Sequence, residues 1–246
     1  MPSSSPHAPA GRREHRKHVT REEILAAGRR LFGEMGLYES RIEDLTREAG
    51  IAKGTIYGYF PNKEALILAV AAKGYGELLA HVRERSAGTR AGTARLRRIA
   101  RAHVEFMAGN PDLMRVLRQV RGMLMFARRE WRPLRSTLAE YLDGLAEVIA
   151  GGPAGPVAGA QARALFGAVS GALSTHAALA DGSLSSVPTD ALSAAATAFA
   201  IRFARSARTV AAPRPRLPAF AEDFEFEHAR PSSGRRDRQV GSRGAE

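Results

Sequence analysis

The chain has 246 residues, of which 44% are hydrophobic and 25% charged, enough for one large soluble domain or two small ones. It lacks cysteine, which excludes disulfides and thiolate metal sites, and no apolar run is long enough for a secretory signal or a membrane span, so we expect a cytoplasmic protein that binds no membrane. The net charge of +12 favours a polyanionic partner, although 33 of the 37 basic residues are arginines, a skew that a GC-rich genome also produces without any function.

Two polar segments flank the region in which we predict structure. Residues 1–18 are rich in proline and serine and then basic, and residues 212–246 are rich in proline, serine, glycine and arginine. Such compositions bury too little apolar surface to fold, so we expect both segments to be disordered. The basic arm in residues 1–18 either enters a minor groove of DNA or only solubilises the chain.

Two capping boxes predict the first two helices. Thr20 with Glu23, and Ser40 with Glu43, have the three-residue spacing at which two side chains cap a helix reciprocally. Apolar residues then recur at helical spacing after each box, and Gly50 ends the second helix.

The rest of the region also has helical signals. A third short helix is predicted over about 52–59, and Asn62 caps a fourth over about 63–85. Asn110 and Pro111 have the pattern of a cap followed by a first helical residue. Further helices are expected over about 93–107, from 111 onward, and over 130–149, 157–180 and 190–207. With no run of alternating β-branched residues, the fold class is all-α with about nine helices.

The stretch AGIAKGTIYGYFPNKEAL, residues 49–66, contains a tight turn between the second and third helices. The turn lies at Gly50, and two short helices joined in this way have the geometry of a helix-turn-helix. We therefore predict a helix-turn-helix over about Ile42–Phe60.

The third helix has two dissimilar faces. On a helical wheel Ile56 and Phe60 point inward, whereas Gly54 and Gly58 form the centre of the opposite face. A glycine in a helix costs about 1 kcal/mol relative to alanine, so a glycine face indicates that a bulky partner comes close to the backbone. A DNA major groove is such a partner, and close packing against another helix is the alternative.

Polar groups flank the glycine face. Lys53 lies near the amino end of the helix, where a recognition helix contacts base edges or phosphates. Thr55 and Tyr57 can donate hydrogen bonds to phosphate oxygens, and Lys63 starts the fourth helix, where a phosphate would be stabilised. These residue types favour DNA over a second helix as the partner.

Residues Thr20–Val70, and above all GIAKGTIYGYFPNKEAL, resemble the amino-terminal DNA-binding domain of the TetR family of bacterial repressors. The resemblance implies a homodimeric, ligand-responsive transcriptional regulator, usually a repressor, without a cofactor and with a palindromic double-stranded DNA operator. It implies a DNA-binding domain over residues 19–65 and a domain for ligand binding and dimerisation over residues 66–211.

The resemblance also assigns roles to single residues. Ala52 replaces the serine that usually caps the third helix, so this cap is lost. Arg41 supplies a positive charge two residues before the position at which the family often has arginine. The residues implied to contact the operator are Arg41, Lys53, Gly54, Thr55, Tyr57, Tyr59 and Lys63.

The last two predicted helices are apolar over wide faces. A monomer would leave one of these faces in water, so we expect it to form the dimer interface, with packing inside one chain as the alternative. The predicted interface residues are Gly167, Gly171, Leu192, Ala196, Phe199 and Phe203.

An effector pocket is expected among the fourth to eighth helices. Residues 83–135 hold 14 arginines against 4 acidic residues, which favours an anionic apolar ligand, although a solvated face is the alternative. The candidate lining residues, each of which can also be plain core, are Phe106, Leu117, Arg118, Arg121, Met125, Trp131 and Tyr141.

Two other function classes compete with a regulator. A nucleoid-type packaging protein would bind DNA through charge alone, without sequence preference. An enzyme is disfavoured, because we find no metal-spaced cluster, phosphate loop or nucleophile motif. His103 and His176 are isolated and fit core or surface positions better than catalytic ones.

Overall fold

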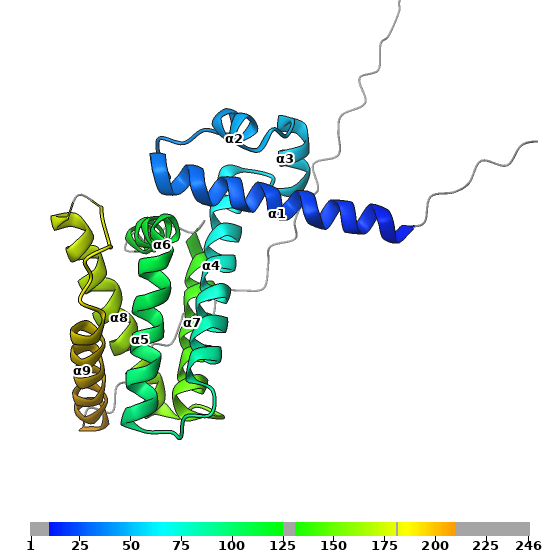
Figure 1. Ribbon diagram of the computed structural model, residues 1–246. Helices are drawn as coiled ribbons and strands as arrows, with labels where there is room; N and C mark the ends of the chain where they lie inside the picture. The colour runs from blue at the N-terminus through cyan, green and yellow to red at the C-terminus, as the bar shows by residue number, and fades with distance from the viewer. Residues whose placement is uncertain (1–9, 125–130, 181, 210–246) are drawn as a thin grey trace, which may run out of the picture. The chain divides into compact units, whose positions relative to one another are not determined.

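The computed structural model describes residues 10–124, 131–180 and 182–209, and side chains within these ranges from Arg21 to Ser206. The described residues form helices and connecting loops without strands, which confirms the all-α fold class (Figure 1). The helices are α1 (Ala10–Met35), α2 (Ile42–Ala49), α3 (Lys53–Tyr59), α4 (Lys63–Ser86), α5 (Thr93–Gly109), α6 (Pro111–Leu124), α7 (Arg132–Ala150), α8 (Pro156–Leu179) and α9 (Thr189–Thr209).

Two of the predicted helix starts are wrong. α1 begins at Ala10 rather than at Thr20, because the arginine, lysine and glutamate residues that predominate before Thr20 are good helix formers. Residues 10–18 of the expected disordered arm are therefore helical, whereas residues 1–9 and the tail 212–246 lie outside the described residues.

At α2 the capping box is shifted by one residue. The N-cap is Arg41, whose backbone N–H donates to the carboxylate of Asp44 over 3.1 Å. Ser40 is instead buried and donates to the carbonyl of Gly36, so its hydroxyl is not available as a cap. The predicted pair of Ser40 and Glu43 is thus replaced by Arg41 and Asp44.

The later helix starts follow the sequence signals more closely. The side chain of Asn62 accepts a hydrogen bond from the backbone N–H of Ala65 over 2.7 Å, which confirms the cap of α4. Asn110, in contrast, donates through its side chain to the carbonyl of Phe106 and accepts from Arg29 over 2.6 Å. Its side chain thus joins α1 to the end of α5, while its backbone carbonyl accepts from the N–H of Met114 over 3.0 Å, so Asn110 holds the predicted position before Pro111, the first residue of α6.

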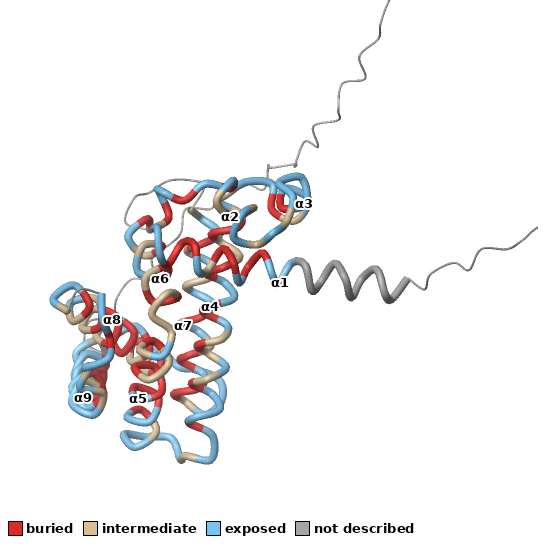
Figure 2. The backbone as a smooth tube through the Cα atoms, turned by 45° about the horizontal axis from the view of Figure 1, so that its top comes forward, coloured by how far each residue is buried: buried red, intermediate tan, exposed pale blue. Residues whose placement is uncertain are grey.

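The helices from α4 onward form a bundle with a continuous apolar core. α4 packs against α5 and α7, and α8 packs against α7 and α9. Buried residues lie along the facing sides of these helices, whereas α3 is exposed over most of its length (Figure 2). By length and composition alone α4 can cross a membrane, and 44% of its most apolar window is buried inside the described protein.

α1 and α6 approach each other closely. A Cβ added at Gly33 of α1 would lie 2.7 Å from the Cβ of Asp112 in α6, so only glycine fits there. The backbone N–H of Leu37, just after α1, donates to the side chain of Gln119 in α6 over 2.8 Å. The first three helices are therefore joined to the rest of the described chain through α6 as well as through α4.

Candidate nucleic-acid interface and interior cavity

α3 has the inner and outer faces that the wheel predicts. Ile56 and Phe60 are buried in the core of the first three helices. Gly54 and Gly58 are exposed, and a Cβ added at either meets no atom of the described chain within 4 Å. α3 starts at an N-cap, Ala52, that makes no side-chain cap, as expected. The glycine face is therefore open to solvent and is not used for packing against another described helix.

Lys53 is paired with an acidic residue of α2. Its ammonium lies 2.5 Å from a carboxylate oxygen of Glu43 and 5.8 Å from the ring centroid of Tyr57. The hydrogen bond between the two charged groups raises the pKa of Lys53 and lowers that of Glu43. The sequence analysis missed this pair, because α2 and α3 must first be placed side by side.

Lys63 holds the loop before α2. Its ammonium donates to the backbone carbonyl of Ser40 over 2.6 Å and to that of Tyr38 over 3.4 Å. An ammonium has three donors, so one remains for a phosphate. Tyr38 is 72% exposed beside this lysine, which adds an aromatic hydroxyl that the sequence analysis did not select.

The other predicted DNA contacts differ in exposure. Arg41, Thr55 and Tyr57 are exposed, as a groove contact requires. Tyr59 is half-buried and packs against the core, so its ring also supports the domain. The structure therefore gathers the exposed candidates of α2 and α3, with Lys63, on one three-helix domain.

A small cavity lies between α5, α6 and α8. Its volume is about 10 Å³, which is room for at most one water molecule. The structure brings three of the predicted pocket residues to its wall: Leu117, Arg118 and Arg121. The complete lining is Met107, Met114, Leu117, Arg118, Arg121, Phe166, Ser170 and Ser174.

The remaining pocket candidates are placed elsewhere. Phe106 points to α4, where its ring lies 5.4 Å from that of His81, and Trp131 is half-buried against the core just before α7. Neither lines the cavity. Met125 lies outside the described residues. Tyr141 is buried beside Phe166, at a ring distance of 5.5 Å, and reaches the cavity only through that ring.

Tyr141 belongs to a buried aromatic cluster with polar edges. Its ring stacks on Tyr75 of α4 at 5.1 Å, and its hydroxyl lies 3.4 Å from Nδ1 of His103 of α5. Phe166 lies 5.8 Å from the ring of His103 and 6.3 Å from that of Tyr75. We call Tyr75, His103, Tyr141 and Phe166 the aromatic cluster. Tyr75 was not predicted for the site, and His103 was expected to be an isolated core or surface residue.

Burial keeps the aromatic cluster neutral. Desolvation, and then the positive charge of Arg121, lowers the pKa of His103 to about 3. Desolvation raises the pKa of Tyr75 to about 12, and that of Tyr141 also rises. At neutral pH the cluster therefore offers hydroxyl donors and one neutral imidazole.

With this geometry in place, comparison with known proteins shows where the chain belongs. Residues 24–70 match the family model described as bacterial regulatory proteins, tetR family. The chain carries a TetR-family amino-terminal domain. The matched segment contains α2, α3 and the glycine face, so the resemblance seen in the sequence is confirmed for the TetR-family domain.

Curated relatives match over part of the chain. The chain is 25% identical over 129 residues to the fatty acid metabolism regulator protein of Bacillus subtilis, across 52% of this chain and 63% of that protein. It is 46% identical over 50 residues to the HTH-type transcriptional regulator YvdT of the same organism, across 20% and 26% of the two chains. The matches thus span less than two thirds of either relative.

Solved structures share the fold over a longer stretch. A TetR-family transcriptional regulator from Mesorhizobium loti superposes with a TM-score of 0.60 at 18% identity, over 78% of this chain and 98% of that one. FadR from Bacillus subtilis, in complex with stearoyl-CoA, superposes with a TM-score of 0.59 at 21% identity, over 73% and 97%. Both confirm the fold, a TetR-family domain followed by a helical bundle.

The predicted dimer face is partly exposed. Phe199 and Phe203 of α9 are 50% and 42% exposed, with their rings 5.9 Å apart, and they border a shallow hollow of about 490 Å³ that includes Gly167. Ala196 is wrong as an interface residue, because it is buried within the chain where α9 packs on its neighbours. Leu192 also packs partly against the core, and a Cβ at Gly167 or Gly171 meets no described atom within 4 Å.

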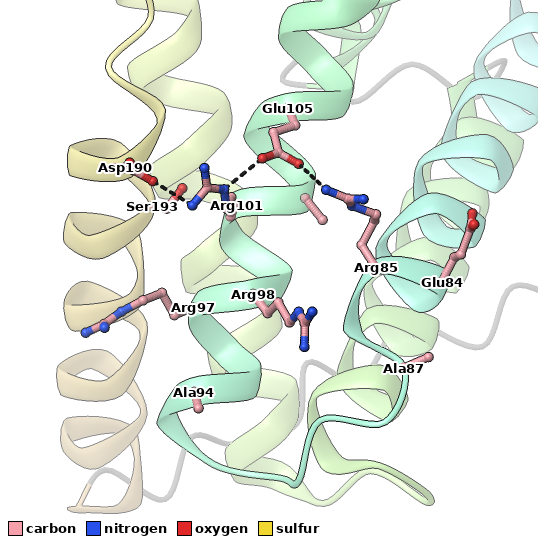
Figure 3. A pocket seen from close by; sticks show the side chains of 11 residues that line it. Glu84, Arg85, Ala87, Ala94, Arg97, Arg98, Arg101, Glu105, Asp190 and Ser193 are labelled. Atoms are coloured by element: carbon pink, nitrogen blue, oxygen red, sulfur yellow. Dashed lines mark hydrogen bonds and ion pairs between the residues drawn. The ribbon is translucent and has the colours of Figure 1, made fainter.

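A charged groove of about 570 Å³ is lined by residues of α4, α5 and α9 (Figure 3). Arg101 lies between Asp190 at 2.9 Å and Glu105 at 2.8 Å, and Glu105 also meets Arg85 at 3.4 Å. The hydrogen bond from Arg101 holds the pKa of Glu105 below its usual value. These ion pairs link the three helices, and Arg97 and Arg98 also line the groove (Figure 3).

Proposed function

We propose that this protein is a ligand-responsive transcriptional regulator that binds a palindromic operator in double-stranded DNA as a homodimer. It acts as a repressor, and a small apolar or anionic molecule releases it from the operator. Its place of action is the cytoplasm, where the DNA is. The observation that carries the proposal is the open glycine face of α3 within a TetR-family domain.

The glycine face supports DNA as the partner. Two exposed glycines in a seven-residue helix lower its stability, and no described helix packs on them. Lys53 and Thr55 flank this face as exposed polar groups, and Tyr57 adds a half-exposed ring. A recognition helix needs these properties to bring its backbone into a major groove and to contact phosphates.

The bundle supports an effector and a second subunit. The cavity between α5, α6 and α8 is bordered by Arg118 and Arg121, which suit an anionic group. A structural neighbour holds stearoyl-CoA, an apolar anionic molecule. The exposed rings of Phe199 and Phe203 suit burial against the same face of a second copy.

The proposal is tested with DNA from the region upstream of the protein's own gene. Fluorescence anisotropy at fixed salt should show a site bound at least about 10³-fold more tightly than random DNA. Gly54→Leu should abolish this preference without loss of stability, because its side chain projects into open space on α3. Gly76→Leu is the matched control, since Gly76 is equally open on α4 and far along the chain from α3.

The same measurement separates the rival functions. A packaging protein would bind random DNA almost as tightly as any site, and Gly54→Leu would change little. An enzyme finds no support in its relatives, which are regulators, and the described residues hold no group of three side chains suited to a metal.

A further inference from the structure

Three buried polar atoms near the cavity lack hydrogen bonds. The hydroxyl of Tyr75, Nε2 of His103 and the hydroxyl of Ser170 have no partner in the described part of the chain. Buried polar groups are normally paired, so three such atoms around one site indicate that a partner is missing. Ser170 also lines the cavity, which connects this deficit to the site where the effector is proposed to bind.

Phe166 lies between the cavity and the aromatic cluster. Its ring forms part of the cavity wall, and it also contacts Tyr75, His103 and Tyr141. Since the cavity holds one water at most, an organic ligand must displace a side chain. Rotation of Phe166 would join the cavity to the unpaired atoms, with Met107 and Met114 as adaptable neighbours.

Charged and neutral polar groups lie around the ring of Phe166. The guanidinium of Arg121 lies 5.4 Å from the centroid of Phe166, and this arginine is only half-buried. The hydroxyl of Tyr75 and Nε2 of His103 belong to buried side chains whose rings contact the same phenylalanine, and the charge of Arg121 acts on both of these groups. A ring in the place of Phe166 would thus have a cation and neutral hydrogen-bonding groups within reach.

We propose that the effector is an aromatic acid with a hydroxyl group on its ring. The carboxylate binds Arg121, the ring takes the place of the Phe166 side chain within the aromatic cluster, and the hydroxyl pairs with Tyr75 and its unpaired neighbours. This inference rests on the proposed regulator function and narrows its effector. A plain acyl chain is disfavoured, because it would leave the polar atoms unpaired.

The test compares matched probes. Binding of 4-hydroxyphenylacetate, phenylacetate and octanoate is measured by the fluorescence of Trp131, the single tryptophan of the chain, with a thermal shift as a second readout. The hydroxylated acid should bind at least about tenfold more tightly than either other probe. Tyr75→Phe should reduce this preference to less than about threefold, whereas Tyr38→Phe, which removes the same atom from an exposed ring, should preserve it.

Operator binding without probe is measured in parallel, so that the two proposals fail separately. If the operator is bound but octanoate binds as well as the hydroxylated acid, or if none of the probes binds, the aromatic-acid inference is wrong and the regulator function stands. If wild-type protein shows no operator preference, the proposed function fails. If Tyr75→Phe kept the full preference for the hydroxylated acid, the proposed pairing of the effector hydroxyl with Tyr75 would also be wrong.

Discussion

The outer face of α3 and the aromatic cluster of the bundle both lower the stability of the fold, but for different reasons. On α3 the loss comes from what is missing: Gly54 and Gly58 have no side chain, and the backbone is open to solvent. In the cluster it comes from what is present: Tyr75 and His103 have buried polar atoms without partners. The first costs about 1 kcal/mol per glycine, and the second about 1–3 kcal/mol per atom.

The difference indicates the kind of partner that each region accepts. An empty, exposed helix face suits a large rigid object that approaches from solvent. Buried unpaired donors suit a small molecule that must enter and replace a side chain. Substitutions in the two regions should therefore change the stability of the fold and the binding of a partner to different extents.

The largest expected effect contrasts the two faces of α3. Ile56→Ala should lower the free energy of unfolding by about 2–5 kcal/mol, because it leaves a cavity in the core. Tyr57→Ala should leave stability within about 0.5 kcal/mol but weaken operator binding by about 1–3 kcal/mol. Urea unfolding and anisotropy measure the two quantities. Equal losses of stability would show that α3 has no distinct outer face.

Acid should destabilise the cluster before it affects the carboxylates. The unfolded imidazole has a pKa of about 6.5 and folded His103 of about 3, so between these values the unfolded chain binds more protons. Stability then falls as the pH falls, by about 1.5 kcal/mol between pH 6.5 and 5. The neighbouring Tyr75 and Tyr141 stay neutral there, because burial raises their pKa values. His103→Leu should reduce this dependence of the free energy of unfolding on pH, and His176→Gln should not.

The variants Tyr75→Phe and Tyr141→Phe should differ by about 1 kcal/mol in their free energy of unfolding. Tyr75→Phe removes an oxygen without a partner, so stability should stay constant or rise. Tyr141→Phe removes the hydroxyl next to Nδ1 of His103 and should lower stability by about 0.5–1.5 kcal/mol. Thermal unfolding of both variants measures the difference. A loss of stability in Tyr75→Phe as large as that in Tyr141→Phe would contradict an unpaired hydroxyl.

The smallest effect concerns Glu43. Glu43→Gln frees Lys53 from its ion pair and removes a negative charge from the DNA-binding side, so operator binding should tighten by about two- to fivefold at low salt. The gain should fade as salt screens the charges. Glu84→Gln at the far end of α4 is the control. No tightening at any salt concentration would mean that Lys53 does not contact the DNA.

The fold and the two faces of α3 could be predicted because their signals are local. Glycine spacing, the cap at Asn62 and the inward positions of Ile56 and Phe60 depend on residues within one or two helical turns. The capping box of α2 was predicted one residue too early, because Ser40 is buried by tertiary packing that the spacing rule does not include.

The aromatic cluster could not be predicted in the same way. Tyr75, His103, Tyr141 and Phe166 come from four helices, and no short segment shows that they meet. Ala196 shows the same limit on α9: an apolar stripe around a helix does not tell which part packs inside the chain and which part stays exposed.

The close contact of α1 with α6 has a consequence for genetics. α6 carries Arg121 on the cavity side and Gln119 on the side of α1. Because α1 and α6 are in close contact at Gly33, the two helices should move together. A selection for cells that keep the target genes silent in the presence of effector should therefore recover two kinds of mutant. One kind, at Arg121, no longer binds the effector; the other, at Gly33 or Gln119, still binds it but no longer releases the operator.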